Sequence, residues 1–296
     1  MESSNKNKVI YKDGEFLNST DAGVDYFSQT LHYGFGAFEG IRSYLTLNGT
    51  KLFKVRQHFE RLKSSCEQIH LPFNWDIEQL IVDTYKLLEA NDLSNAYVRP
   101  FVYADEDMSM VTSKKAHLVI VAWQWDAFYG DKTLRTCLSA YEKPSPQALP
   151  ITSKITGNYI NSVLAITDAK NKGFDEAILL DQNGYVTETT SANIFIEKAG
   201  KLYTPKKGNI MAGITRSTII QIAEQLDIEV EEKDITFEEF KAAESAFLCG
   251  TAVEIIGLRS IDNVVFPQNF SESLGSTIQR VYKSLVLDKL SFEVII

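Results

Sequence analysis

Hydrophobic and polar residues alternate over several short stretches that reverse direction at an Asp-Gly or Asn-Gly pair. One such stretch surrounds Asp13-Gly14, a second surrounds Asn48-Gly49 and a third surrounds Asn183-Gly184. These pairs are preferred in two-residue hairpin turns, because such turns need backbone angles that glycine and asparagine tolerate. The pattern therefore predicts β-hairpins over residues 9–16, 41–54 and 176–188.

Other segments repeat apolar residues every three or four positions, as one buried face of a helix requires. The clearest repeat follows Asp76, which can cap a helix start, and consists of Ile77, Leu80, Ile81, Thr84 and Leu88. Similar reasoning predicts helices over residues 56–69, 161–172, 215–226 and 273–287. Strand-rich segments with scattered helices favour a mixed α/β (α+β) architecture over regular βαβ winding.

A segment of aromatic, glycine and charged residues, 124–132, follows the apolar run that ends at Trp123. This composition is typical of an ordered linker, and 296 residues are enough for about two domains. We therefore expect an N-terminal α/β domain over residues 1–123, an interdomain loop over 124–135 and a larger C-terminal domain over 136–296.

Composition narrows the function classes further. The net charge of −9 argues against a general nucleic-acid binder. The apolar run at 116–123 is too short to span a bilayer, and the first residues lack the apolar stretch of a signal peptide. Cys66, Cys137 and Cys249 form no redox or zinc pattern, and the four histidines show no metal-ligand spacing. We expect a cytoplasmic protein without a metal site or a membrane partner.

Lys154 and Glu188 are the two residues that suggest a chemistry. A lysine amine can form a Schiff base with the aldehyde of pyridoxal phosphate (PLP). A carboxylate against the pyridine nitrogen can keep that nitrogen protonated, so that the ring withdraws electrons. Taken singly, such a lysine is more often a solvated surface charge and such a glutamate more often a surface residue of a hairpin strand.

The residues around this pair resemble the class IV aminotransferases, which are PLP enzymes of fold type IV. The signature of that family is filled here by Glu188, Thr190, Asn193-Ile194-Phe195, Leu202-Tyr203-Thr204 and Met211-Ala212-Gly213-Ile214-Thr215-Arg216. The resemblance extends from about Tyr11 to Leu258. It implies a small N-terminal α/β domain and a larger C-terminal pseudo-barrel domain that carries Lys154 and Glu188.

The resemblance also implies the residues that bind the cofactor. Lys154 would form the Schiff base and then act as the acid and base, while Glu188 would pair with the pyridine nitrogen. The phosphate would be held by Arg56, by Gly213 with the N–H groups of Ile214 and Thr215, and by Thr251; Tyr159 would bond to a cofactor oxygen. Three of them have a plainer interpretation. Arg56 could be a surface arginine at a helix start, Gly213 a turn before a helix, and Tyr159 a half-buried helix aromatic.

Two segments are similar to branched-chain aminotransferases in particular, namely His32 to Arg42 and Ala96 to Pro100. The resemblance implies that Tyr97 and the N–H groups of Thr251 and Ala252 hold the substrate α-carboxylate. The pocket would consist of Phe38, Gly40, Tyr159, Trp125 and Phe128, with Tyr33 and the Met108/Met110 region supplied by the other subunit of a homodimer or larger homo-oligomer. Relatives commonly carry tyrosine where Phe128 aligns. Phe38 and Met110 could instead be ordinary core residues.

The expected reaction is transamination of L-leucine, L-isoleucine and L-valine with 2-oxoglutarate, a step of branched-chain amino-acid biosynthesis. Arg99, aided by Tyr33, would pair with the second carboxylate of glutamate; a structural ion pair is the alternative role of Arg99. Another class IV activity is the alternative enzyme function, for example a D-amino-acid or R-amine aminotransferase or an aminodeoxychorismate lyase. A PLP-fold protein that binds without catalysis is a third interpretation.

Overall fold

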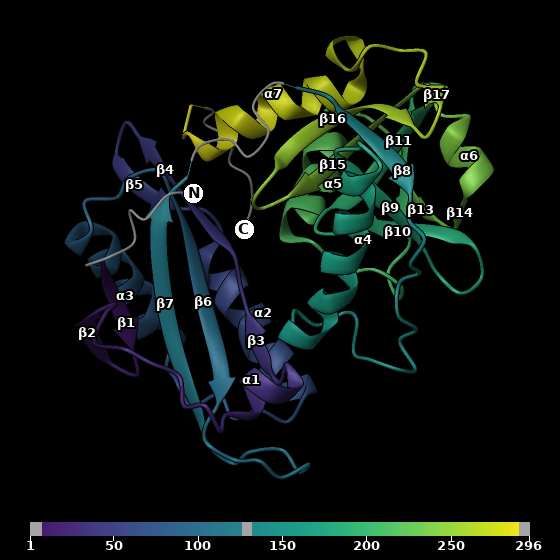
Figure 1. Cartoon of the computed structure of the whole chain (residues 1–296). Coiled ribbons are helices and arrows are strands. Elements are labelled where there is room, and N and C mark those ends of the chain that lie inside the picture. Colours follow the sequence, from purple (N-terminus) through teal and green to yellow (C-terminus); the bar gives the residue numbers. More distant parts are fainter. Residues whose placement is uncertain (1–7, 126–131, 290–296) are drawn as a thin grey trace. The chain divides into compact units, whose positions relative to one another are not determined.

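A computed structural model describes residues 8–125 and 132–289 of the chain. These residues form two compact units, one made of residues 8–125 with Ser153–Gly157 and the other of residues 132–152 with 158–289 (Figure 1). Each unit has a sheet and a hydrophobic core of its own. Within the described ranges, no helix has both the length and the apolar composition needed to cross a membrane.

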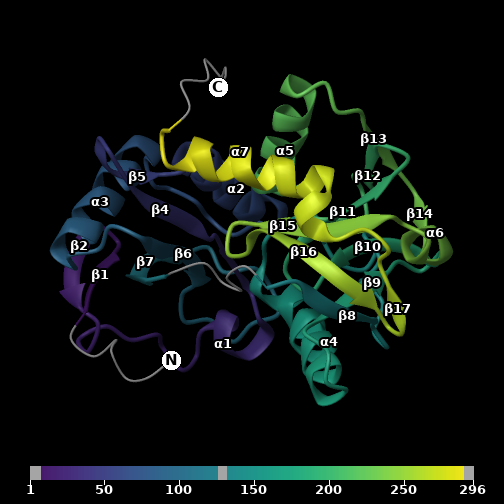
Figure 2. The same cartoon turned by 90° about the horizontal axis from the view of Figure 1, so that it is seen from above.

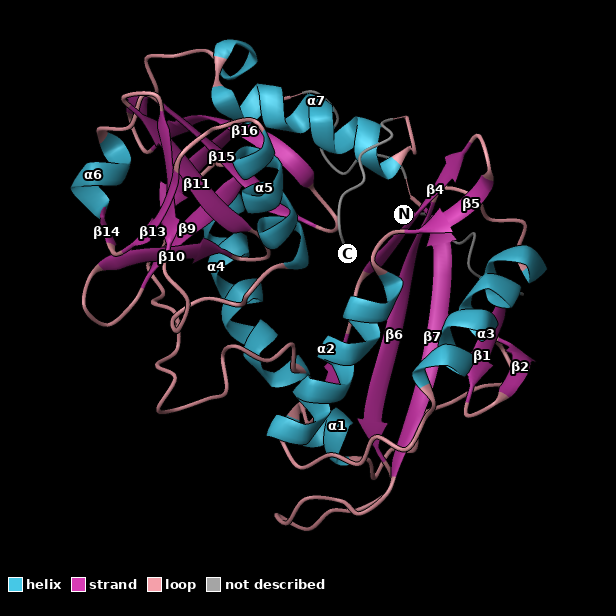
Figure 3. Cartoon of the chain, turned by 180° about the vertical axis from the view of Figure 1, so that it is seen from behind, coloured by secondary structure: helices cyan, strands magenta, loops and turns pink. Residues whose placement is uncertain are grey.

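The first unit is built on an antiparallel sheet with strand order β2-β1-β7-β6-β4-β5, and β3 also pairs with β6. Helices α2 and α3 cover one face of this sheet (Figure 3). Its strands are β1 (Val9–Lys12), β2 (Glu15–Asn18), β3 (Gly36–Phe38), β4 (Ile41–Thr46), β5 (Gly49–Leu52), β6 (Ala96–Ala104) and β7 (Ala116–Gln124). Its helices are α1 (Gln29–Tyr33), α2 (Val55–Gln68) and α3 (Ile77–Ala90).

Local sequence signals agree with the elements of this unit. Both expected hairpins are present, but the second turns at Leu47-Asn48, one residue before the expected pair, because Gly49 already pairs with Thr46. Gly14 in the first turn and Gly49 directly after the second have φ values of 103° and 102°, which favour glycine. Asp76 caps α3 as expected, because its carboxylate accepts a 2.9 Å hydrogen bond from the Gln79 N–H. The core lies between the sheet and the two helices and includes Phe59 and Leu87.

The segment Ser153–Gly157 belongs to the first unit, although we expected it in the C-terminal domain. Its main chain lies beside β3, where the Phe38 N–H donates to the Lys154 carbonyl at 3.0 Å and Ala37 pairs with Ile155. Ile155 is 7% exposed and packs into the core of this unit. Burial of this side chain and the main-chain bonds give the segment its place.

The second unit contains a barrel, in line with the expected pseudo-barrel. Strand pairing runs β11-β15-β16-β8-β9-β10, and β10 then pairs with β11 again and closes the ring. The strands of this unit are β8 (Leu134–Leu138), β9 (Glu176–Leu180), β10 (Tyr185–Thr189), β11 (Asn193–Lys198), β12 (Lys201–Pro205), β13 (Val230–Lys233), β14 (Ile235–Thr236), β15 (Ser245–Gly250), β16 (Glu254–Ile261) and β17 (Val264–Val265). The expected hairpin at Asn183-Gly184 joins β9 to β10.

Helices surround this barrel. Helix α4 packs on β9, α5 on β15, and α7 lies along β16 (Figure 2). The helices are α4 (Tyr159–Asn171), α5 (Ile214–Gln225), α6 (Phe237–Lys241) and α7 (Leu274–Val286), and short 3-10 turns cover Thr156–Asn158 and Phe270–Glu272. All five expected helices of the chain are present, with ends within about two residues. The domain limits at 123 and 135 stay a prediction, since residues 126–131 lie outside the described ranges.

Candidate active site

Lys154 of the first unit is held through its main chain. Its N–H donates to the Ser65 hydroxyl of α2 at 3.0 Å, and its carbonyl accepts from the Phe38 N–H at 3.0 Å. Its ammonium group lies 4.8 Å from the centre of the Phe38 ring. Burial lowers the pKa of Lys154 to about 8, against the opposing effect of the nearby Glu39 carboxylate. A neutral, nucleophilic amine is therefore accessible near neutral pH.

Glu39 forms a buried ion pair beside this lysine. Its side chain is fully buried, and it accepts hydrogen bonds from Arg61 at 2.6 and 2.9 Å and from His58 at 2.8 Å. Burial alone would raise the pKa of Glu39, but Arg61 and His58 hold it well below its usual range. Burial lowers the pKa of His58, so the imidazole is neutral at pH 7 and donates from Nδ1. The charge of Glu39 is thus balanced by Arg61.

Five expected substrate residues also meet in this unit. The Arg99 guanidinium lies 4.6 Å from the Phe38 ring and 5.3 Å from the Tyr97 ring, and the Tyr97 and Trp125 rings are 5.5 Å apart. Tyr97 and Arg99 face the same side of β6, as their spacing of two predicts. Gly40 is required here, because a Cβ at this position would lie 1.8 Å from the Tyr97 hydroxyl.

The residues around Lys154 form one group, and the charges of this group favour an anionic ligand. In the described part of the unit, the group holds the cations Lys154, Arg61 and Arg99 but a single carboxylate, Glu39. The Nε atom of Arg99 is buried and has no hydrogen-bond partner among the described residues. Buried donors are rarely left unpaired, so the arrangement is suited to a ligand that carries phosphate or carboxylate groups.

In the second unit, Glu188 lies at the seam where β10 meets β11. Its side chain is 7% exposed, and one oxygen accepts from the Asn193 amide at 3.1 Å and from the Met211 N–H at 3.2 Å. The other oxygen pairs with the ammonium of Lys143. These partners fix the carboxylate, as a partner for a protonated ring nitrogen must be.

The remaining signature residues hold the same end of the barrel in place. The Thr204 hydroxyl bonds to the Ile194 carbonyl at 2.8 Å and accepts from Arg216 Nε at 3.1 Å. Arg216 is 2% exposed and also pairs with Glu232. Its side chain therefore anchors α5 to the neighbouring strands.

The start of α5 resembles an anion cradle. Gly213 precedes the helix without a side-chain cap, and the first N–H groups of a helix, here including those of Ile214 and Thr215, are suited to binding an anion. A Cβ at Gly213 would lie 2.1 Å from the Asn193 amide oxygen, which explains the glycine. The Thr251–Ala252 turn follows β15 at the same end, because Cys249 pairs with Asn193.

Not every expected residue joins these two groups. The Arg56 guanidinium is 55% exposed and pairs with Glu78 of α3, away from Glu39 and Lys154. Tyr33 and Met110 are 47% and 85% exposed and belong to an apolar surface of the first unit. Tyr159 is the first residue of α4, and Phe128 lies outside the described residues.

Three residues of the two groups were absent from the sequence interpretation: Glu39, Arg61 and Lys143. For Arg61 a signal existed, because the periodicity of α2 places it beside Leu62 and near His58 on the buried side of the helix. Glu39 stands within the branched-chain segment but carries no local sign of its ion pair. Lys143 lies in a loop, and nothing in the sequence connects it with Glu188.

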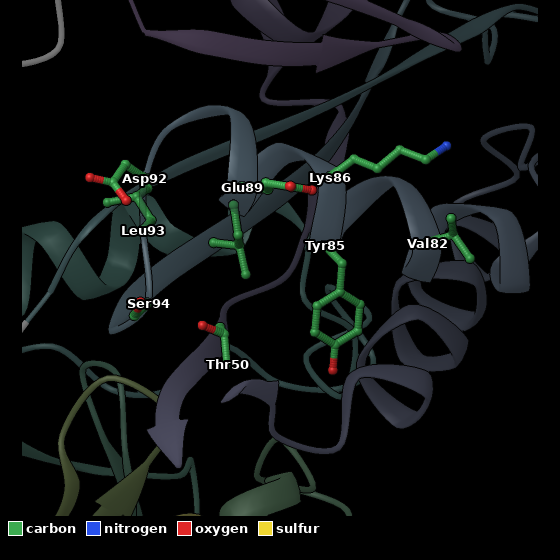
Figure 4. A pocket seen from close by; sticks show the side chains of 9 residues that line it. Thr50, Val82, Tyr85, Lys86, Glu89, Asp92, Leu93 and Ser94 are labelled. Atoms are coloured by element: carbon green, nitrogen blue, oxygen red, sulfur yellow. The ribbon is translucent and has the colours of Figure 1, made fainter. Parts of the chain in front are cut away.

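A separate hollow of the first unit, about 540 Å³, lies beside α3 and β5 (Figure 4). Its charged lining residues Lys86, Glu89 and Asp92 are exposed. None of the expected chemical residues lines it. This hollow is therefore a weaker candidate than the groups around Lys154 and Glu188.

Both groups fit pyridoxal phosphate, the cofactor that the resemblance implies. The first unit offers an amine with a lowered pKa and surplus positive charge. The second offers a fixed carboxylate and a helix start that a glycine leaves open. An aldehyde, a ring nitrogen and a phosphate need these partners.

Comparisons with known proteins lead to the same family. The family model for amino-transferase class IV matches residues 36–261. The branched-chain-amino-acid aminotransferase of Pseudomonas aeruginosa is 35% identical over 98% of this chain and 96% of its own length. The solved Escherichia coli branched-chain aminotransferase has a TM-score of 0.94 and 31% identity over 98% of both chains.

A third match is a solved T.th. branched-chain aminotransferase complexed with N-(5'-phosphopyridoxyl)-L-glutamate. It has a TM-score of 0.93 and 29% identity over 97% of this chain and 96% of its own. Because the family model covers most of the chain and the Pseudomonas relative is matched almost end to end, this protein belongs to the class IV aminotransferases.

Proposed function

We propose that this protein transfers the amino group of L-leucine, L-isoleucine or L-valine to 2-oxoglutarate, with PLP as its cofactor. The observation that carries the proposal is the buried amine of Lys154, held over the Phe38 ring beside Tyr97 and Arg99. The names of the relatives support the branched-chain substrates. Bound phosphopyridoxyl-glutamate in the T.th. enzyme supports both the cofactor and the second substrate.

Lys154, Glu188 and the N–H groups near α5 have separate roles in this reaction. When bound, PLP supplies a ring that withdraws electrons and makes the Cα proton of an amino acid acidic. Lys154 would hold the aldehyde of the cofactor through its amine and would carry the proton removed from the substrate Cα. Glu188, fixed by Asn193 and Lys143, would pair with the pyridine nitrogen and favour its protonated form. The N–H groups at the start of α5 and those of the Thr251 turn would bind the anionic oxygens.

Lys154 gives the direct test of the function. The purified protein should show a visible absorbance band from bound PLP, and L-leucine should bleach that band. Borohydride reduction and peptide mapping should locate the pyridoxyl group on Lys154. Lys154→Ala should abolish turnover without unfolding the protein. A pyridoxyl group on Lys170, or a band that D-alanine bleaches and L-leucine does not, would contradict the assignment.

For the phosphate, Arg61 is a better candidate than Arg56. Arg61 is 17% exposed on the side of α2 that meets Glu39, whereas Arg56 is 55% exposed and paired on the surface. Both oxygens of Glu39 bind the Arg61 fork, so the guanidinium is held in place, and its charge acts on the nearby Lys154. We therefore assign phosphate binding in the first unit to Arg61.

Arg61→Met should weaken PLP binding by roughly 10- to 100-fold, as expected for loss of a charged hydrogen bond. Arg56→Met, on the same helix, is the matched control and should bind PLP as the wild type does. The dissociation constant is measured from PLP absorbance. Because Arg61→Met leaves Glu39 unpaired, the double variant Glu39→Gln/Arg61→Met checks that misfolding is not the cause. A larger loss in Arg56→Met would restore the original assignment.

Arg99 allows one pocket to accept both the branched-chain amino acids and glutamate. Transamination uses one pocket for both an aliphatic side chain and the second carboxylate of glutamate. Phe38 provides an apolar surface, and the guanidinium of Arg99 lies against that surface with a buried, unpaired Nε among the described residues. A carboxylate in an apolar pocket without such a partner would cost several kcal/mol.

In Arg99→Met, the half-reaction with L-glutamate should slow much more than the half-reaction with L-leucine, because only glutamate needs the charge. Each half-reaction is followed separately through the cofactor absorbance in stopped flow. Arg99→Lys keeps the charge and should recover part of the glutamate rate. Equal losses with both amino acids would make Arg99 a structural residue.

An exposed apolar surface on the first unit supports a homodimer. It consists of Val24, Tyr26, Phe27, Leu31, Tyr33, Met108, Met110 and Val111, each 44% exposed or more. The two segments that form it, one with α1 and one around Met108 to Val111, are joined by hydrogen bonds, since Tyr33 donates to the Met108 carbonyl and Gln29 to the Val111 carbonyl. An ordered apolar surface of this extent is typical of a protein interface.

Met110→Asp should therefore shift the protein toward monomer in sedimentation velocity, because a charge in an apolar interface is costly. Leu47→Asp, on the exposed turn between β4 and β5, is the control and should leave the oligomeric state unchanged. If Tyr33 and Met108 complete a partner's pocket, activity falls together with the dimer fraction. An active monomer would exclude that role.

The cysteines support the cytoplasmic location. Cys66, Cys137 and Cys249 are all free and buried. Reduced thiols of this kind are typical of proteins in a reducing compartment.

A further inference from the structure

Ser65 occupies an unusual position for a helical serine. It lies on the buried side of α2 and is 1% exposed, in the same row as His58 and Leu62. A buried hydroxyl destabilises a fold unless it forms a hydrogen bond. Here it accepts the main-chain N–H of Lys154 at 3.0 Å, from a segment 89 residues away in the sequence.

The other side of Lys154 is fixed as well. Its carbonyl accepts the Phe38 N–H at 3.0 Å, and the next residue, Ile155, pairs with Ala37. Thr156 then bonds to the Gly34 and Gly36 carbonyls. Both peptide groups next to the lysine Cα are therefore held, one by a side chain and one by a strand.

We propose that Ser65 is a positioning residue for Lys154. Its hydroxyl fixes the point from which the lysine side chain extends, so that the amine stays over the Phe38 ring and near Glu39. The inference rests on the proposed role of Lys154 as the cofactor lysine. Ser65 touches neither cofactor nor substrate in this role and acts through the main chain alone.

The effect of this hydrogen bond on the amine follows from the surroundings. The titratable groups that act on the amine are Glu39, His58, Arg61, Tyr97 and Arg99, and burial lowers its pKa to about 8. If the main chain loosens, the amine spends more time in water, where a lysine has a pKa of about 10.4. Loss of the Ser65 hydroxyl should therefore raise the pKa of Lys154. It should also weaken PLP binding, because the lysine must be ordered again.

The chain offers two matched controls. Ser64 is the neighbouring serine on the exposed side of α2, where its hydroxyl contacts Gln68. Thr84 of α3 has a fully buried hydroxyl in the same unit, which donates to the Leu80 carbonyl of its own helix at 2.7 Å. Ser64→Ala tests the helix, and Thr84→Val tests a general loss of stability.

The experiment uses the full chain freed of PLP. A trace of acetic anhydride is applied over a range of pH, and acetylation of Lys154 is measured by mass spectrometry against the exposed Lys63. The midpoint of the wild type is expected near pH 8. Ser65→Ala should raise the midpoint by about half a unit or more and weaken PLP binding roughly threefold to tenfold. Ser65→Thr should restore both, and the two controls should match the wild type.

An unchanged midpoint in Ser65→Ala would overturn the proposal, as would an equal rise in Thr84→Val. The acetylation arm needs no cofactor, so it reports on Ser65 even if the function assigned above is wrong. If the proposed function is wrong, PLP will not become attached to Lys154 even in the wild-type protein.

Discussion

The pairing of Glu188 with Asn193 is the constraint on which the second unit depends. It is the contact that joins β10 to β11, and with it the ring of strands closes. The same Asn193 side chain bonds to the Glu188 carboxylate and to the Met211 carbonyl, which leads to Gly213 and α5. The Asn193 side chain therefore links the closing pair of strands to the Glu188 carboxylate and to the segment that leads into α5. The signature residues Glu188, Asn193 and Gly213 therefore serve both the fold of the second unit and its proposed chemistry.

The first unit is subject to a different constraint, because it buries several positive charges close together. Arg61 and the neutral His58 satisfy Glu39, and this leaves a positive surplus on Lys154 and Arg99. Aromatic rings stabilise that surplus, since the Phe38 ring lies within 5 Å of both the Arg99 and Lys154 cations. Such a group favours binding of an anion, because one carboxylate cannot neutralise three cations.

The sequence was sufficient wherever structure is local. The turn pair Asp13-Gly14 and the apolar repeat after Asp76 determine their own hairpin and helix. It was insufficient where distant segments meet, as in the parallel pairing of Leu134 with Leu258 or the place of Ile155 beside Ala37. The site follows the same rule. Lys154 and Glu188 stand in recognisable motifs, whereas the difference between Arg56 and Arg61 depends on which side of α2 is buried.

The place of Ser153–Gly157 also has a consequence for biogenesis on the ribosome. The sheet and helices of the first unit are complete by residue 124, but Ile155, which fills part of its core, is made later. Until then the nascent chain holds an unfilled apolar gap beside β3, while the first strand of the second unit has already been synthesised. The lysine segment is therefore the last piece of the first unit to arrive, and cutting the chain at 126 would produce a fragment with a defective core.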